Sequence, residues 1–337
     1  MPPVAPSVPS ASGAEGRVAD SKTFARGVVF ATVGALLWGF SGACAQFLFA
    51  NYEIEASFVT MVRSLAAGLM FLAVLFARRR KTLLSMLRDR RTMLRLLVFG
   101  VGLFGSQFAF VMSVSCTNAG TATVLQMSGS VFIMVFTCLI ARKLPQLREV
   151  AGLIAAVAAT WLIATQGDPS VLTLPAAGLA WGMVNGLAVA LYVMYPKRLF
   201  SMWGSFASTG LAMFVCAAIG AVAWIAPQAG GVVFGQVPLD ALELAFPALD
   251  AAGWVALLAG VGCIGTFVAF GMYLRGVSMV GPVTGGLLGA FEPLGAMIVS
   301  AVWLGTSFSG ADWAGFALMM VMLVLVTVTP ANGRAAI

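Results

Sequence analysis

The distribution of basic residues between ten long apolar segments is the strongest constraint on this chain. The connections between these segments alternate, because every second one contains no Lys or Arg. The remaining connections and the two tails contain all but one of the 19 basic residues. Lys and Arg are retained in cytoplasmic loops, so the pattern predicts a polytopic membrane protein with both ends in the cytoplasm. The predicted spans are roughly residues 27–50, 56–77, 93–113, 118–140, 150–166, 175–195, 204–226, 251–274, 280–303 and 311–330.

Composition supports a membrane protein and argues against a soluble one. The chain is 61% hydrophobic and 9% charged, whereas a soluble domain is about 25% charged. A segment of about 20 apolar residues crosses the hydrocarbon core as a helix, because its backbone groups must be bonded within the segment. The net charge of +7 is explained by the cytoplasmic loops and does not indicate a nucleic-acid partner. We therefore expect an all-α membrane protein of ten transmembrane helices.

The segments outside the spans are short and polar. Residues 1–22 are rich in Pro, Ala, Ser and Gly, which predicts a disordered cytoplasmic tail. Residues 331–337 are expected to form a second, short cytoplasmic tail. Seven acidic residues are predicted on the opposite side of the membrane, namely Glu53, Glu55, Asp168, Asp240, Glu243, Asp250 and Asp312.

The chain contains an internal repeat. Residues 101–112 (VGLFGSQFAFVM) resemble residues 261–272 (VGCIGTFVAFGM), and Trp38-Gly39 corresponds to Trp181-Gly182. The halves 27–166 and 175–330 therefore match as two sets of five spans. Five is an odd number, so equivalent spans cross the membrane in opposite directions. Inverted repeats of this kind are typical of secondary transporters, which bind substrate between the two halves.

The residues at these positions resemble a known family. The chain is similar to the drug/metabolite transporter superfamily, and within it to the EamA-type permeases, over residues 27–330. The resemblance rests on the two five-span halves, on Arg63 within FVTMVRSL, on TNAGTAT at the start of the fourth span, and on FEPLGAM in the ninth. It implies export of amino acids or related metabolites across the bacterial inner membrane. It also implies a central cavity lined by spans one, three, four, six, eight and nine.

Two ionisable residues, Arg63 and Glu292, lie well inside predicted spans. A charge at this depth costs about 2.5–3.5 kcal/mol, so each should face protein or a wet cavity. One hypothesis is that Arg63 grips a substrate carboxylate or that Glu292 carries a coupling proton. The alternative is that either residue is structural and bonds to backbone carbonyls; the position of Arg63 nearer the rim favours this for Arg63, whereas both interpretations stay open for Glu292. The depths of the two residues are similar enough for them to meet if the second and ninth spans approach each other.

Polar and aromatic side chains inside the spans are the candidates for the cavity wall. Polar groups would orient a substrate and aromatic walls would hold its side chain, although each is also a plausible interhelical contact. Gly285, Gly289 and Pro293 are candidates for a hinge or for close packing in the ninth span, because proline leaves a carbonyl without its helical partner. The candidates for the cavity wall are Trp38, Gln46, Arg63, Gln107, Gln126, Trp181, Asn185, Tyr192, Thr266, Tyr273 and Glu292.

Other classes of function are disfavoured. The chain has no GxxxxGK[ST] motif, no histidine and only isolated cysteines, so we expect no ATP hydrolysis, no metal, no cofactor and no enzymatic activity. A channel or a membrane sensor remains the alternative to a carrier. The expected partners are a small-molecule substrate and the lipid bilayer, with protons and a second copy of the chain as further candidates. Transport would occur by alternating access, driven by proton exchange or by the substrate gradient.

Overall fold

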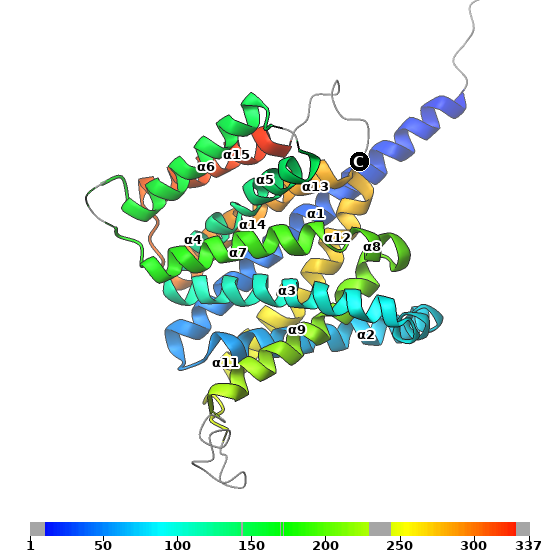
Figure 1. Ribbon diagram of the computed structural model, residues 1–337, viewed down its shortest axis with the longest axis horizontal. Helices are drawn as coiled ribbons and strands as arrows, with labels where there is room; N and C mark the ends of the chain where they lie inside the picture. Colours follow the sequence, from blue (N-terminus) through cyan, green and yellow to red (C-terminus); the bar gives the residue numbers. More distant parts are fainter. Residues whose placement is uncertain (1–10, 143, 169, 171, 229–243, 328–337) are drawn as a thin grey trace, which may run out of the picture.

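The computed structural model describes residues 11–142, 144–168, 170, 172–228 and 244–327, and its elements in these ranges are all helices (Figure 1). Within them, nine helices are long and apolar enough to cross a membrane, and Gly310–Val326 is a shorter apolar helix. Some predictions fall outside the described residues. These are residues 1–10 of the N-terminal tail, Asp240, Glu243, the last residues of the tenth predicted span, and the tail 331–337.

The two halves contain equivalent series of helices. The first half comprises α1 (Ala11–Asn51), α2 (Ala56–Arg88), α3 (Arg90–Cys116), α4 (Ala119–Gln126), α5 (Gly129–Ala141) and α6 (Leu147–Thr165). The second comprises α7 (Ala176–Met194), the short α8 (Lys197–Trp203), α9 (Ser205–Gln228), α11 (Ala251–Trp254), the π-helix η2 (Val255–Val268), α12 (Ala269–Val280), α13 (Pro282–Gly289), α14 (Phe291–Leu304) and α15 (Gly310–Thr327).

Two helices, α1 and α2, extend furthest beyond the spans predicted from hydropathy. Helix α1 begins at Ala11, so residues 11–22 are helical in the structure although the sequence pattern predicts a tail there. The prolines of that segment end at Pro9, and the Ala, Glu and Arg residues that follow are good helix formers. Helix α2 continues through its basic end to Arg88, with a kink at Arg79 (φ −140°, ψ 40°). Hydropathy reports the membrane-crossing part of a helix rather than its full length.

Helix packing follows the internal repeat. Helix α1 packs against α12, η2 and α14, and its counterpart α7 packs against α3, α4 and α5. The contact of α2 with η2 likewise has its counterpart in the contact of α9 with α3. Two further contacts join equivalent helices of the two halves, α2 with α9 and α6 with α15. These two pairs lie on opposite sides of the molecule (Figure 1). Exchanging the two halves therefore preserves these principal helix contacts, as a two-fold relation between them requires.

The fourth and ninth spans are both broken near their middle. The first break is at Met127 (φ −60°, ψ −20°), whose N–H bonds to Val124 O at 3.1 Å. The second is at Ala290 (φ −67°, ψ −7°), whose N–H bonds to Leu287 O at 3.2 Å. These bonds link residues three apart and tighten the helix locally, as in a 3₁₀ turn. The two breaks fall at similar places in the two halves, three residues before Ser130 and two residues before Glu292.

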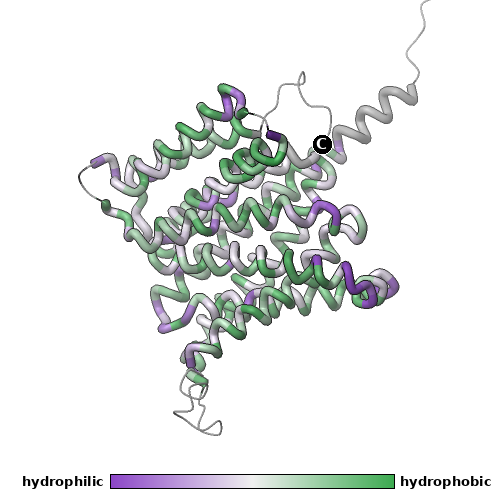
Figure 2. Tube along the Cα trace, in the orientation of Figure 1, coloured by the Kyte–Doolittle hydropathy of each residue, from purple (hydrophilic) through white to green (hydrophobic). Residues whose placement is uncertain are grey.

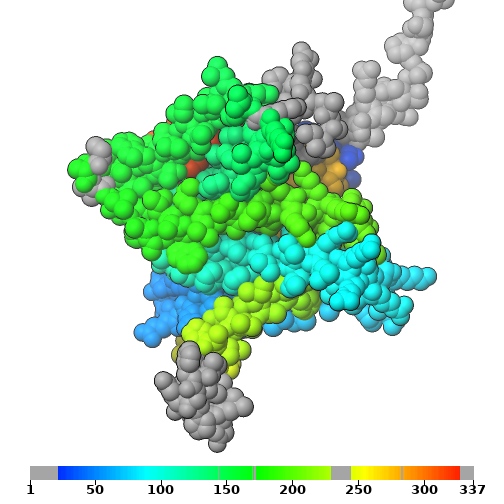
Figure 3. Space-filling view, in the orientation of Figure 1, coloured from blue at the N-terminus to red at the C-terminus, as the bar shows by residue number. Residues whose placement is uncertain are grey.

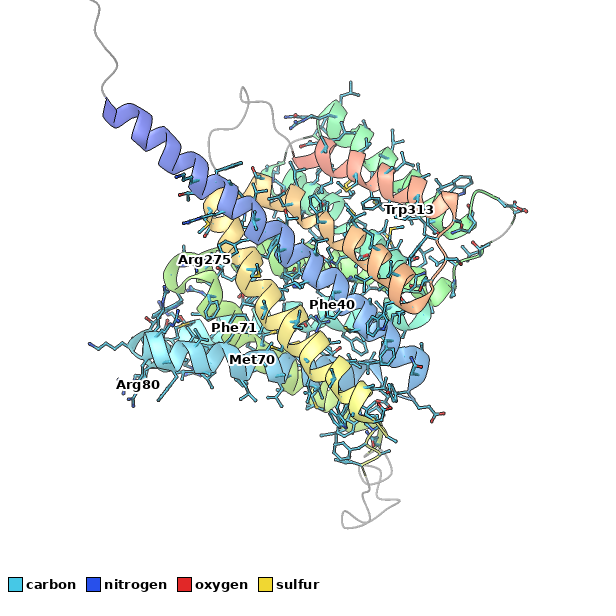
Figure 4. The ribbon with its side chains drawn as sticks, turned by 180° about the vertical axis from the view of Figure 1, so that it is seen from behind. Phe40, Met70, Phe71, Arg80, Arg275 and Trp313 are labelled. Atoms are coloured by element: carbon cyan, nitrogen blue, oxygen red, sulfur yellow. The ribbon has the colours of Figure 1, made fainter. Side chains whose placement is uncertain are left out.

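Polar residues gather at the ends of the bundle. Figure 2 shows hydrophobic residues along the middle of the helices and hydrophilic ones at their ends. Arg80 of α2 and Arg275 of α12 lie at one end, whereas Trp313 of α15 lies towards the other (Figure 4). On the face drawn in Figure 3, atoms of α7 and α3 form a continuous surface. The labelled basic residues Arg80 and Arg275 thus share one end of the bundle.

Candidate functional site

A cavity of about 630 Å³ lies between the two halves of the molecule. Its wall contains side chains from all six spans that the family resemblance implies, and Thr209 of α9 and Leu323 of α15 also contribute. Both helix breaks reach it, through Met127 in the first half and Ala290 in the second. The cavity extends to Phe200, Ser205 and Ser278, near the helix ends that carry basic residues. It therefore connects the middle of the bundle with its basic end.

A smaller space of about 60 Å³ continues the cavity and contains the two intramembrane charges. Arg63 of α2 and Glu292 of α14 both line it, together with Gln107 of α3. Its wall shares six residues with the larger cavity, namely Trp38, Leu103, Gln126, Tyr192, Phe270 and Glu292. The structure thus brings Arg63 and Glu292 to one polar chamber, although they belong to different halves of the chain.

A chain of hydrogen bonds leads to Glu292. Ser106 Oγ lies 3.1 Å from Asn185 Oδ1, Asn185 Nδ2 donates to Gln126 Oε1 at 2.8 Å, and Gln126 Nε2 donates to Glu292 Oε1 at 3.2 Å. A hydroxyl group is the donor to Asn185 Oδ1, so the amide nitrogen of Asn185 is free to donate onward. The chain therefore has a fixed direction and presents an N–H donor to the carboxylate.

The guanidinium group of Arg63 is fixed by a hydrogen bond to a neighbouring helix and borders the chamber. The Arg63 side chain is only 6% exposed, and its Nε donates to Thr266 Oγ1 at 3.2 Å. Thr266 in turn donates to Val261 O at 2.8 Å, a contact that spans the wide turn of the π-helix. Among the described residues Arg63 and Glu292 form no ion pair and no direct hydrogen bond with each other. The two charges therefore line the same space without neutralising one another by contact.

Glu292 is positioned by close packing of α14 on α1. A Cβ atom added at Gly39 would lie 2.5 Å from the Ala296 nitrogen and closer still to the Glu292 carbonyl oxygen. Only glycine permits this approach, because no real Cβ tolerates such contacts. The aligned Gly182 of α7 serves the same purpose against Leu125 of α4, where the added Cβ would lie 2.6 Å from the side chain.

In the described part of the chain, the end of the molecule opposite the basic residues is closely packed. Buried residues of α1, α2, α3, α4, α9 and η2 form one apolar cluster there. Gln46 joins three segments, because its Oε1 accepts from Ala119 N at 2.9 Å and Ser300 Oγ at 3.0 Å, and its Nε2 donates to Thr306 Oγ1 at 2.8 Å. Outside the spans, Tyr52 donates to Asp250 at 2.5 Å, and this hydrogen bond lowers the pKa of Asp250. The cavity is thus one-sided.

The predicted site residues fall into three groups. Trp38, Gln126, Tyr192, Tyr273 and Glu292 line the larger cavity, and Arg63 and Gln107 line the small chamber. Asn185 and Thr266 lie behind this wall and orient Gln126 and Arg63 by hydrogen bonds.

The third group does not line the cavity. Gln46 belongs to the closed end, and Trp181 packs edge-on against Phe108 with ring centroids 5.6 Å apart. Of the hinge candidates, Gly289 and Pro293 line the cavity. Gly285 is not part of the described lining, and its carbonyl oxygen accepts a hydrogen bond from the Tyr273 hydroxyl at 2.9 Å.

Sequence reasoning missed part of the cavity wall. Phe270 packs against Trp38 with ring centroids 4.8 Å apart, yet it is prominent in the sequence only as a conserved position of the internal repeat. Phe200 and Ser205 belong to the connection after α7 and to the start of α9, which hydropathy alone assigns to the membrane edge. Both residues lie close to basic residues in the sequence, and this proximity could have indicated that the cavity reaches the membrane edge.

Comparisons with known proteins agree with this architecture. A model of the EamA-like transporter family matches the chain twice, over residues 25–165 and 176–328. A Salmonella typhimurium protein named "Uncharacterized inner membrane transporter YicL" is 30% identical over 303 residues, which are 90% of this chain and 95% of the relative. One solved crystal structure matches with a TM-score of 0.57 and 18% identity, covering 89% of this chain and 97% of its own. At that identity, the structural likeness concerns the fold alone.

Proposed function

The chain belongs to the EamA-like transporter family, and from this membership we propose that it is a secondary carrier exporting amino acids or related small metabolites. It would act in the bacterial inner membrane, where the Salmonella relative is named as a transporter. The proposal comprises ten spans with both ends in the cytoplasm, formed by inverted repeats at residues 27–166 and 175–330. Family membership makes it a membrane transporter rather than an enzyme.

The observation that carries the proposal is the one-sided cavity with Arg63 and Glu292 at its inner end. Basic residues mark the cytoplasmic side of a membrane protein, so the cavity is open towards the cytoplasm. The opposite end is closed by the apolar cluster and by the hydrogen bonds of Gln46. A binding site that communicates with one side at a time is the arrangement that alternating access requires.

The repeat supplies the second conformation. Each half has a broken helix that reaches the cavity, and the two halves make corresponding contacts. If the halves exchange conformations, the basic end closes and the opposite end opens around the same chamber. The alternative functions are a channel and a membrane sensor. The closed outer end favours a carrier over a channel, because a conducting pore must be open to both sides.

The proposal is tested by exchange across proteoliposomes. Vesicles are loaded with a mixture of amino acids and small metabolites, and mass spectrometry of the retained pool identifies the solutes that leave. Exchange of an identified solute should then saturate with its concentration and show counterflow, because a carrier must reorient with each substrate. Flux that rises without saturation and shows no counterflow would establish a channel instead. The absence of any selective flux by monodisperse protein would contradict the transport function.

The role of Glu292 in proton coupling gives a separate prediction. The charged and titratable groups around its carboxylate are Arg63 of α2, Tyr192 of α7 and Tyr273 of α12. Glutamine has the same shape but cannot release a proton, so Glu292→Gln should exchange substrate without responding to an imposed pH gradient. The matched control is Glu53→Gln, which changes an exposed carboxylate outside the helices. If Glu292→Gln responds to the gradient as the unmodified protein does, Glu292 is not the proton carrier.

A further inference from the structure

We propose that the substrate is an amino acid with free amino and carboxyl groups and a large apolar side chain. Its charged head would lie between Arg63, Gln107 and Glu292, and its side chain would occupy the aromatic part of the larger cavity. This inference rests on the transport function proposed above and narrows its substrate class. It is carried by the division of the site into a small charged chamber and a large apolar one.

The first argument is the state of the Arg63 guanidinium group. An arginine presents five N–H donors in a planar fork, and only the Nε–H is bonded, to Thr266 Oγ1. The terminal nitrogens have no hydrogen bond to any described residue, although Arg63 is 6% exposed. The planar fork matches a carboxylate in a bidentate geometry. Thr266 holds the group from behind and leaves this fork directed at the chamber.

The second argument is the carbonyl oxygen of Gln107. Gln107 is 7% exposed and lines the small chamber, and its Oε1 has no hydrogen-bond partner among the described residues. Its amide nitrogen faces Met213 Sδ and Cys216 Sγ, each at 3.5 Å. A buried acceptor without a donor is costly, so a ligand that supplies an N–H group is favoured there. An ammonium group has three donors, which suit Gln107 Oε1 together with the Glu292 carboxylate.

The third argument is charge balance. Arg63 and Glu292 carry opposite charges and do not pair directly. A substrate with one carboxylate and one ammonium group compensates both, whereas an acid or an amine alone leaves one of them without its counter-charge in a low-dielectric site. The hydrogen-bond chain from Ser106 occupies only one oxygen of Glu292. The ammonium group and the coupling proton would use this carboxylate in turn.

The larger chamber selects the side chain. A volume of about 630 Å³ lies within the usual range for small-molecule sites, about 300–1,000 Å³. Trp38, Phe270 and Tyr273 form an aromatic contact group, since Trp38 lies 4.8 Å from the Phe270 ring and 4.6 Å from the Tyr273 ring. Glu292 is the charged residue in the described lining, and Phe99, Phe200 and Val277 continue the wall towards the basic end. This environment suits phenyl, indolyl or branched aliphatic groups and disfavours charged ones.

The test is competition for counterflow of L-phenylalanine in proteoliposomes. Leucine and tryptophan should compete well. The analogue without the amino group, 3-phenylpropionate, and the analogue without the carboxylate, phenethylamine, should each compete at least about tenfold more weakly, because a site built for a hydrogen-bonding group rejects a ligand lacking it. Alanine, lysine and glutamate should also compete weakly. Equal competition by either phenyl analogue, or by alanine, would overturn the inference.

Two variants connect the selectivity to the chamber. Gln107→Met retains the length of the side chain without its carbonyl oxygen and should reduce the advantage of phenylalanine over 3-phenylpropionate. Arg63→Gln should reduce the advantage over phenethylamine, and monodispersity in detergent shows whether it is folded. Gln228→Met is the matched control, since Gln228 bonds to Trp224 O and Ala245 N outside the chamber. Unchanged selectivity in both folded variants would contradict the assignment of these side chains.

The failures of the two proposals are distinguishable. If phenylalanine is not exchanged but another solute from the loaded mixture is, the carrier function stands and the substrate class inferred from the chambers is wrong. If monodisperse protein exchanges no solute at all, the transport function itself is contradicted, and the substrate class with it.

Discussion

Replacement of Gly286 by phenylalanine is expected to lower substrate exchange by at least about tenfold while the protein remains folded. Gly286 lines the cavity, and a Cβ atom added there meets no other atom within 4 Å. The new ring would therefore extend into the substrate space without displacing a helix. A tenfold loss corresponds to about 1.4 kcal/mol, which is small compared with the cost of excluding a substrate from its site. Glycine is also a poor helix former, so the substitution within α13 does not oppose folding.

The matched control for this variant is Gly271→Phe. Gly271 lies in α12, also has open space around an added Cβ, and is not part of the cavity wall. The same change of residue type there should leave exchange close to that of the unmodified protein. Exchange is measured as counterflow, and folding as monodispersity and melting temperature in detergent. Equal exchange by the two variants would show that the cavity is not the substrate path.

Much of the helical architecture is predictable because the membrane imposes simple rules. Apolar length predicts the spans, and the positions of Lys and Arg predict their order across the membrane. The described helix Gly310–Val326 covers most of the tenth predicted span, whose last residues lie outside the described part of the chain. The break in the fourth span was not predicted. Gly289 and Pro293 indicate a break in the ninth span, and Ser128-Gly129 directly after Met127 is the corresponding signal in the fourth span, which our prediction did not use.

The chemistry of the site is harder to predict from the repeat than its backbone. Gly39 and Gly182 occupy aligned positions and both allow a broken helix to approach. The tryptophans next to them have diverged, since Trp38 lines the cavity and Trp181 packs on Phe108 away from it. Polar composition at depth identified Gln46 as well as Gln126, but Gln46 bonds at the closed end. Depth along a helix can be read from sequence, whereas the direction of a side chain depends on tertiary packing.

The asymmetry between the halves has a functional consequence. Arg63, Gln107 and Gln126 come from the first half, whereas Asn185, Thr266 and Glu292 come from the second. The hydrogen bonds Asn185–Gln126 and Arg63–Thr266 therefore cross between the halves on both sides of the chamber. Movement of one half relative to the other must change these contacts. We therefore expect that a substrate bound in the polar chamber would influence the relative position of the halves.

The close approach of α1 and α14 leads to the second prediction of large effect, for Gly39→Val. An added Cβ would lie 2.5 Å from the Ala296 nitrogen, and the backbone atoms it meets cannot rotate away as a side chain can. We expect a loss of about 3 kcal/mol in the free energy of unfolding, at the upper end of typical overpacking costs. Because α14 carries Glu292, separation of the two helices should also displace the carboxylate from Gln126 and reduce exchange.

The control for Gly39→Val is Gly271→Val, which places the same side chain in a helix where an added Cβ has no neighbour within 4 Å. Valine costs little relative to glycine in a helix, so this control should melt at or slightly above the temperature of the unmodified protein. Melting temperature in detergent and the yield of monodisperse protein measure the difference. Gly39→Val with unaltered melting would mean that α1 and α14 are not held at this distance, and the chamber between Arg63 and Glu292 would then lack the fixed geometry on which recognition of a substrate head group depends.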